Sequence, residues 1–191
     1  VDGSRRLKSD VRFSVVGDCD ELNSIVGLVR MECSRLPLHH QDGGDRKNAG
    51  RVHFICDTAL SRIQHELFDL GAELACPPET LPEYMVLLSQ EQTDVLMAEM
   101  DAWLASLPEL TSFILPAGSP PVACLQVART VVRRLERDIV QLQDREGDAS
   151  VRPLVKVYVN RLSDWLFVMG RWVSTMLNEQ EALWVPLGKR P

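Results

Sequence analysis

The feature that most constrains the fold is an apolar repeat in two long segments in the second half of the chain. Between residues 119 and 144 the apolar positions recur alternately every three and four residues, at Leu125, Ala128, Val132, Leu135, Ile139 and Leu142. Residues 152–178 repeat the pattern at Val155, Val159, Leu162, Leu166, Met169, Val173 and Met176. Because an α-helix has about 3.6 residues per turn, this spacing lines apolar side chains along one side. We therefore predict two long amphipathic helices.

Weaker versions of the same periodicity predict three further helices, at residues 18–34, 51–75 and 89–106. Asp18 is expected to cap the first of these, with Glu21 as its third helical residue in a capping-box-like arrangement. The prolines of "CPPETLP" should end the second helix, because proline lacks the N–H that continues it. Five helices with short links predict an all-α bundle, in a single domain over residues 1–191.

Composition limits the classes of function. With 191 residues, 45% of them hydrophobic, the chain is long enough to bury one sizeable core. A net charge of −6 argues against a nucleic-acid or anionic-membrane partner, because such binding needs a broad basic surface. The five cysteines are scattered without CxxC pairs, which favours a reducing intracellular compartment over a disulfide framework. No apolar run approaches the roughly 20 residues that span a bilayer.

The segment "ARTVVRRLERDIV" places four arginines in the nine positions from Arg129 to Arg137. On a helix, Arg129, Arg133 and Glu136 share one stripe beside the apolar side. Guanidinium groups this close repel one another, and one glutamate does not neutralise them. A polyanion would, because the planar fork of arginine donates paired hydrogen bonds to phosphate or carboxylate oxygens. A solvated or ion-paired bundle face is the alternative that the helix alone leaves open.

The last predicted helix carries a second polar stripe. Asn160, Asp164, Phe167 and Arg171 follow at steps of four, three and four, so they are predicted to face outward, opposite the apolar side. This would place a carboxamide and a carboxylate beside the arginines. Alternatively, Asp164 pairs only with Arg161 or Arg171 on its own helix.

Two connecting segments are also informative. "LTSFILPAGSPP" precedes the arginine-rich helix, and its Phe113 suits either a buried core or a wedge in a ligand site. Residues 36–50 are polar and glycine-rich, which predicts a surface loop. This loop contains His39 and His40, which we expect to be solvated, because adjacent residues on a flexible loop seldom converge on one metal ion. No metal site is predicted.

Three stretches together resemble a known family: "VGDCDELNSIVGLVR", "LTSFILPAGSPPVACLQVARTVVRRLERDIV" and "VNRLSDWLFVMGRWV". They are similar, in order and spacing from Val15 to Val173, to the ATP:cob(I)alamin (corrinoid) adenosyltransferases of the propanediol-utilisation and mitochondrial cobalamin type. The resemblance implies a five-helix bundle of ferritin-like, up-and-down topology, assembled as a homotrimer with ATP and the corrinoid held where subunits meet.

The implied reaction is attack by cob(I)alamin on the 5′-carbon of ATP, giving adenosylcobalamin and triphosphate, with Mg²⁺ arriving on the phosphates. Implied partners are a B12-dependent mutase or dehydratase and a flavin reductase. The implied location is the mitochondrial matrix in a eukaryote or the cytoplasm in a bacterium. An adenosylcobalamin-delivery chaperone and a catalytically silent scaffold are the alternatives. A di-iron bundle fits less well, because no Glu-x-x-His pair is present.

The resemblance also implies roles for individual residues. The ATP-binding residues would be Lys8, Arg133, Glu136, Arg137 and Asn160. The corrinoid-binding residues would be Phe113, Arg161 and Asp164. Phe113, Arg133 and Asp164 would be catalytic, with Phe113 filling the lower face of the corrinoid. Asp20 and Arg129 would form a salt bridge between subunits.

The sequence departs from the family pattern at three places. A "TGDxGxT"-like phosphate loop is not found, the loop at 36–50 is longer than usual, and the tail "LWVPLGKRP" has no counterpart that we can assign. The first departure bears directly on nucleotide binding, because backbone N–H groups of such a loop cradle phosphate.

Overall fold

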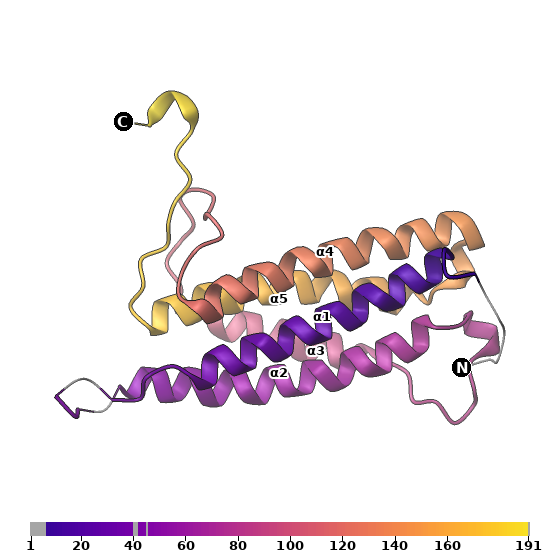
Figure 1. Cartoon of the computed structure of the whole chain (residues 1–191), viewed down its shortest axis with the longest axis horizontal. Coiled ribbons are helices and arrows are strands. Elements are labelled where there is room, and N and C mark those ends of the chain that lie inside the picture. The colour runs from indigo at the N-terminus through magenta and orange to yellow at the C-terminus, as the bar shows by residue number, and fades with distance from the viewer. Residues whose placement is uncertain (1–6, 40–41, 45, 191) are drawn as a thin grey trace.

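The structure, a computed structural model, describes residues 7–39, 42–44 and 46–190. These residues form five long helices, shown in Figure 1: α1 (Val11–Ser34), α2 (Lys47–Leu74), α3 (Gln90–Leu104), α4 (Pro120–Glu146) and α5 (Pro153–Met176). Three single 3₁₀ turns follow α2, α4 and α5: η1 (Pro78–Thr80), η2 (Asp148–Ser150) and η3 (Leu187–Lys189). The described part of the chain contains no strand, and an isolated bridge joins Ile114 to Leu183. The prediction of an all-α, five-helix fold is confirmed.

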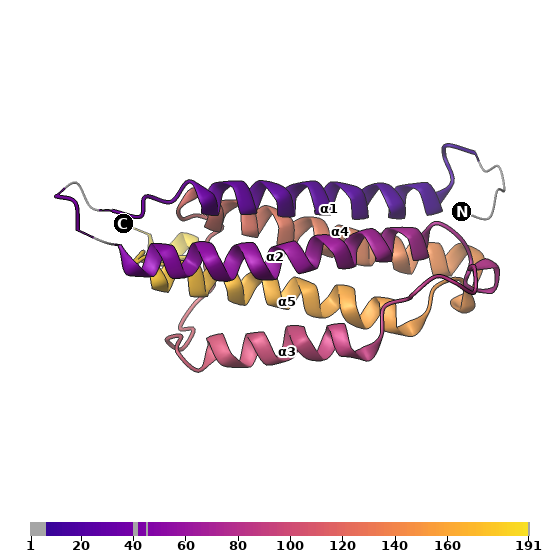
Figure 2. The same ribbon diagram turned by 90° about the horizontal axis from the view of Figure 1, so that it is seen from below.

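Four helices make up the body of the bundle. Helix α1 packs against both α2 and α4, and α5 packs against α4 and more lightly against α2. The shorter α3 lies on the outer side of α5, as Figure 2 shows. Trp103 of α3 contacts two rings of α5, with ring centroids 5.3 Å from Trp165 and 5.6 Å from Trp172. No helix in the described ranges is both long and apolar enough to cross a membrane.

The apolar sides predicted for α4 and α5 form the centre of this core. The six apolar positions that predicted α4 are all fully buried, and so are nearly all those that predicted α5. Burying one leucine or valine side chain contributes roughly 1.5–3 kcal/mol to folding. Because the apolar repeat runs along the length of both helices, α4 and α5 bury these apolar sides when they pack against each other. The observed limits of α3, α4 and α5 fall within two residues of the predicted ones, whereas α2 begins at Lys47 rather than at residue 51.

The predicted start of the first helix was wrong. Helix α1 begins at Val11, with Asp10 as its N-cap, and the Asp10 side chain accepts a hydrogen bond from the backbone N–H of Arg12 at 2.9 Å. Asp18 lies inside the helix and pairs with Arg134 of α4 instead of capping. The apolar repeat in fact continues upstream of Asp18, through the buried Val11 and Val15, and the contacts of the buried Arg12 anchor this extra length of helix.

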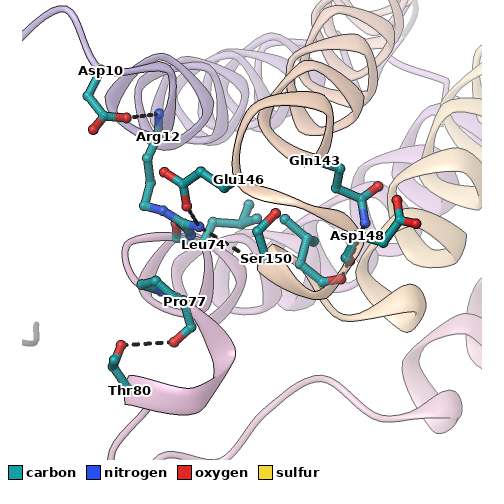
Figure 3. A network of polar contacts seen from close by, with 10 residues as sticks. Asp10, Arg12, Leu74, Pro77, Thr80, Gln143, Glu146, Asp148 and Ser150 are labelled. Carbon is teal, nitrogen blue, oxygen red and sulfur yellow. Dashed lines mark hydrogen bonds and ion pairs between the residues drawn. The ribbon is translucent and has the colours of Figure 1, made fainter.

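Arg12 joins the ends of three helices (Figure 3). Its side chain is 2% exposed, and it donates to the carbonyl oxygen of Leu74 at the end of α2, at 2.9 Å. It also donates to the Glu146 carboxylate at the end of α4 and, at 3.3 Å, to the carbonyl oxygen of Ser150. A cation at helix C-termini satisfies carbonyls that have no partner within the helix. This contact places the N-terminal end of α1 beside the C-terminal end of α4, so the two helices are antiparallel.

A second buried network ties α2, α3 and α5. The Tyr158 hydroxyl donates to Glu66 at 2.6 Å, and burial, with Glu66 adding to it, raises the pKa of Tyr158 well above its ordinary value. Arg62 bridges Glu66 at 2.8 Å and Glu99 of α3 at 2.7 Å, and Trp165 also donates to Glu99. The network fixes how α3 lies on the bundle, because breaking it would leave buried polar groups unpaired.

Candidate functional site

The four arginines between residues 129 and 137 of α4 divide into two sets. Arg134 points to α1, where it pairs with Asp18 at 3.0 Å and with Glu21. Arg129, Arg133 and Arg137 form no ion pair with any described carboxylate. Arg134 is therefore structural, and the other three form a face of the helix on which no guanidinium has an ion-pair partner among the described residues. We call these three residues the cationic face.

Side-chain contacts hold part of the cationic face in place. Arg129 is half-buried: its Nε donates to Gln126 at 2.9 Å, and its guanidinium lies 6.0 Å from the ring centroid of Phe167 on α5. Burial and, to a smaller extent, the neighbouring Arg133 lower the pKa of Arg129. Arg137 donates to the carbonyl oxygen of Arg133 at 2.9 Å. These contacts orient guanidinium groups without neutralising them.

Glu136 and Asn160 lie beside this face. The Asn160 side-chain amide of α5 donates to Glu136 of α4 at 2.9 Å, so the hydrogen bond links the two helices. The structure thus brings together four of the five residues predicted for ATP: Arg133, Glu136, Arg137 and Asn160. Arg161 and Asp164 pair with each other at 2.9 Å on the surface of α5, which is the same-helix alternative that the sequence left open for Asp164.

The prediction that Arg171 faces outward with Asn160 and Asp164 was wrong. Arg171 is 5% exposed and forms a bidentate ion pair with Glu181, its Nε lying 2.8 Å and its Nη2 3.3 Å from the two carboxylate oxygens. Its Nη2 also donates to the carbonyl oxygen of Pro108 at 2.8 Å. The physical reason is that the chain after α5 folds back over this end of the bundle and covers the arginine.

Phe113 lies on the loop between α3 and α4, and its side chain is 79% exposed. The tail lies alongside this loop beyond the ends of α4 and α5 (Figure 1). The backbone N–H of Trp184 donates to the carbonyl of Phe113 at 2.7 Å, and that of Leu115 donates to the carbonyl of Ala182 at 2.8 Å. The rings of Phe113 and Trp184 meet edge to face, with centroids 6.1 Å apart. The sequence did not reveal the contact between Trp184 and Phe113, because two short segments joined by two backbone hydrogen bonds have no periodic pattern.

Lys8 contacts none of the other predicted ATP-binding residues in the described part of the chain. It precedes α1, with its Nζ 5.4 Å from the ring centroid of Phe13, and its neighbours Leu7 and Ser9 line a hollow with Leu142 and Glu146 near the end of α4. The same end contains Glu146, which is nine residues beyond Arg137, or about 14 Å along α4. Within the described residues, Lys8 thus lies beside the C-terminal end of α4, beyond the cationic face along this helix.

Asp20 and Arg129 are not paired within one chain either. Asp20 is exposed on α1, where it lines a hollow of about 450 Å³ between α1 and α2, together with Phe13 and Phe68. Arg129 contacts α5 instead. Both residues remain available for contacts outside the chain.

Comparison with known proteins decides the family. The sequence profile of the family described as cobalamin adenosyltransferase matches residues 1–173, a span that includes the cationic face, Glu136, Asn160 and Phe113. The chain belongs to this family.

Adenosyltransferases from distant organisms are similar over nearly the whole chain. A corrinoid adenosyltransferase of Mycobacterium tuberculosis is 40% identical over 190 residues, which cover 99% of this chain and 88% of the relative. The human corrinoid adenosyltransferase MMAB is 33% identical over 188 residues, covering 96% and 67%. The sequence similarity therefore extends to adenosyltransferases of bacteria and of human.

Solved structures of PduO-type adenosyltransferases have a similar fold. A variant PduO-type ATP:corrinoid adenosyltransferase from Lactobacillus reuteri, complexed with cobalamin and ATP, superposes with a TM-score of 0.78 at 30% identity, covering 95% of this chain and 90% of that one. A second variant of that type, complexed with ATP, gives a TM-score of 0.79 at 29% identity, covering 96% and 92%. In this adenosyltransferase the cationic face lies on helix α4, whereas Phe113 lies on the loop that precedes this helix.

Proposed function

We propose that the protein transfers the 5′-deoxyadenosyl group of ATP to cob(I)alamin, and that the cationic face holds the triphosphate. The observation that carries this is the set of three arginines without ion-pair partners among the described residues, in a member of the cobalamin adenosyltransferase family. A catalytically silent scaffold would gain stability by pairing these arginines with carboxylates. In this protein Arg134 is paired in that way, with Asp18 and Glu21. An anionic substrate explains why they are left unpaired.

The reaction balances without a further reactant. The cobalt(I) centre supplies an electron pair to the ribose 5′-carbon, a cobalt–carbon bond forms, and the bond from that carbon to the phosphate oxygen breaks. Triphosphate leaves with the bond's electrons, so negative charge develops at the leaving oxygen. Arg133 and Arg137 would stabilise that charge as fixed donors, which is an effective form of catalysis because no reorganisation is needed. Glu136 and Asn160 would orient the ribose and the arginines.

Phe113 is proposed to contact the lower face of the corrinoid. Its exposed aromatic ring, held on a loop with Trp184 beside it, supports this role. An aromatic wall there keeps the dimethylbenzimidazole base off the cobalt, so that cob(II)alamin is easier to reduce. Arg161 and Asp164, paired at the surface of α5, would contact the corrinoid edge, Asp164 acting with Arg133 and Phe113 in catalysis.

The site is proposed to be completed by a second chain in a homotrimer. Lys8 would reach the phosphates from the neighbouring subunit, and Asp20 would pair with Arg129 across the interface. Among the described residues Lys8 makes no contact with the cationic face, and Asp20 makes none with Arg129, which supports this arrangement. An ion pair partly buried at an interface is costly to break, because one charge is left desolvated and unpaired.

Mg²⁺ is proposed to enter with ATP. Among the described residues, no group of three or more histidine, cysteine or acidic side chains is arranged to hold a metal ion. Mg²⁺ usually keeps several waters and binds through substrate phosphates and one or two carboxylates, so it does not require such a group.

The chemistry also implies partners. Forming cob(I)alamin from cob(II)alamin takes one electron, for which we propose a flavin reductase as donor. Adenosylcobalamin would pass to a B12-dependent mutase or dehydratase. Because relatives occur in bacteria and in human, we expect the bacterial cytoplasm or the mitochondrial matrix as the compartment.

The direct test is to mix reduced cobalamin, Mg-ATP and the protein, and to follow corrinoid absorbance. Conversion to the adenosylcobalamin spectrum is expected, and its absence under reducing conditions would overturn the proposal. A second test addresses the composite site by mixing Lys8→Ala and Arg133→Ala chains, each impaired alone. If each site takes Lys8 from one chain and Arg133 from another, random trimers should recover about a quarter of wild-type activity. No recovery would place both residues on the same chain's site.

A further inference from the structure

We propose that the ion pair between Arg171 and Glu181 is a latch that fastens the C-terminal segment, residues 179–184, to the Phe113 loop, residues 108–118. Arg171 and Glu181 are then positioning residues, which act on corrinoid binding through Phe113. The inference rests on the proposed function in so far as Phe113 contacts the corrinoid.

The latch joins three parts of the chain at one buried point. Arg171 belongs to α5, Glu181 to the tail, and the carbonyl of Pro108, which accepts from the same guanidinium, to the start of the Phe113 loop. Arg171 is 5% exposed and the Glu181 side chain 19%. Removing one partner of such a pair is strongly unfavourable, because the other charge stays buried without compensation. In the described part of the chain, no other ion pair links the tail to the helices.

The tail makes further contacts on each side of the latch. Asn178, with φ of 56°, turns the chain back after α5, and the Glu179 carboxylate accepts from the backbone N–H of Ser119 at 3.0 Å. That N–H lies at the N-terminus of α4, where an anion is favourable. Beyond Glu181, the Ser112 hydroxyl donates to the carbonyl of Trp184 at 3.1 Å, beside the two backbone hydrogen bonds of Phe113 and Leu115.

These contacts decide where Phe113 lies. Its loop is interrupted by Pro116 and Gly118, and Phe113 itself is 79% exposed, so core packing does not fix the ring. Two backbone hydrogen bonds between short extended segments are marginal on their own, since even an isolated two-stranded hairpin is barely stable in water. The pairing therefore depends on an anchor outside itself. The latch supplies that anchor, because Glu181 directly precedes the paired residues Ala182 and Trp184.

The experiment compares Glu181→Gln with Glu109→Gln as a matched control. Glu109 lines the same hollow of about 330 Å³ as Glu181 but has no ion pair with a described residue. For each protein, backbone amide hydrogen exchange is measured without ligand, and KM is measured separately for corrinoid and ATP. Glu181→Gln is expected to speed exchange at Leu115 and Trp184 at least tenfold, leaving central α4 and α5 amides unchanged. It should raise the corrinoid KM about tenfold, or ~1.4 kcal/mol, and the ATP KM less than about twofold.

Several outcomes would overturn the latch. Unchanged exchange at Leu115 and Trp184, equal increases in both KM values, or the same effects in Glu109→Gln would each do so. Arg171→Lys keeps the buried charge but loses the bidentate geometry, so it should give an intermediate effect; it also serves if Glu181→Gln does not fold.

Phe113→Ala, measured in parallel, separates this inference from the proposed function. If Phe113→Ala weakens corrinoid binding and Glu181→Gln does not, the latch is wrong while the role of Phe113 stands. If Glu181→Gln speeds exchange and Phe113→Ala leaves the corrinoid KM unchanged, the latch holds the loop but Phe113 does not bind corrinoid, so the proposal that Arg171 and Glu181 act on binding is overturned.

Discussion

The cationic face and the Phe113 loop are built in opposite ways. Arg129, Arg133 and Arg137 project from the middle of a long helix whose other side is fully buried, so their spacing is set by the helix itself. Phe113 lies on an irregular loop and takes its position from a tail that is distant in sequence. A site for a highly charged triphosphate can be preformed, because rigid donors bind it best. A surface for a large planar corrinoid can instead be assembled from two irregular segments that are distant in sequence and held together by hydrogen bonds and an ion pair.

The largest effect is expected from Arg133→Ala, which tests the cationic face. Loss of one fixed donor to the leaving group should lower kcat/KM about 100- to 1000-fold. Because Arg133 is exposed and forms no ion pair with a described carboxylate, the Tm should change by less than about 2 °C. Steady-state kinetics and a thermal melt measure the two quantities, with Arg51→Ala on the exposed side of α2 as control. A large fall in Tm with little loss of activity would mean that Arg133 is structural.

Phe113→Ala tests the Phe113 loop. If the ring packs on the corrinoid, its removal should cost ~1.5–3 kcal/mol of corrinoid affinity, or about tenfold to a hundredfold in Kd. ATP binding should stay near normal, while turnover that starts from cob(II)alamin should fall. Calorimetric titration with each ligand separates the effects. Comparable losses for ATP and corrinoid would indicate that Phe113 supports the fold rather than the ligand.

A smaller effect is expected for the contact between subunits. Asp20→Ala and Arg129→Ala should each weaken assembly, seen as a concentration-dependent fall in molar mass by light scattering. If the two side chains pair, the double variant should be less damaging than the sum of the single ones, by roughly 0.5–3 kcal/mol. Additive effects would show that the residues act independently.

The smallest effect is expected for Asp138, which is part of the α1–α4 contact behind the cationic face. Burial, and then a hydrogen bond with Asp18, raises the pKa of Asp138. A carboxyl with a raised folded-state pKa destabilises the fold once it is ionised, so wild type should lose stability as the pH rises through that pKa. Asp138→Asn should therefore raise the Tm at pH 7 by about 1–2 °C, and the gain should vanish as the pH falls below the ordinary aspartate range. A gain that grows on acidification would contradict this assignment.

The sequence predicted the parts of the fold that depend on local repetition. The apolar spacing in α4 and α5 is continuous, so both helices, their pairing and the position of the cationic face followed from it. The start of α1 did not, because Asp18 and Glu21 also fit a capping box, and the contacts of Arg12 with α2 and α4 that hold the true start are not visible in the sequence. Arg171 was misplaced for the same reason, since its partner Glu181 belongs to a tail that carries no pattern. Contacts between distant segments decide such cases, and one sequence does not display them.

The central claim is that the cationic face is left unpaired because it binds triphosphate. The most direct measurement is calorimetric titration of the assembled wild-type protein, and of the Arg133→Ala/Arg137→Ala double variant, with inorganic triphosphate at several salt concentrations. The double variant is expected to bind about 100-fold or more weakly, with a shallower dependence of log Kd on log salt, while Arg51→Ala should bind like wild type. Equal affinity and equal salt dependence in all three proteins would contradict it.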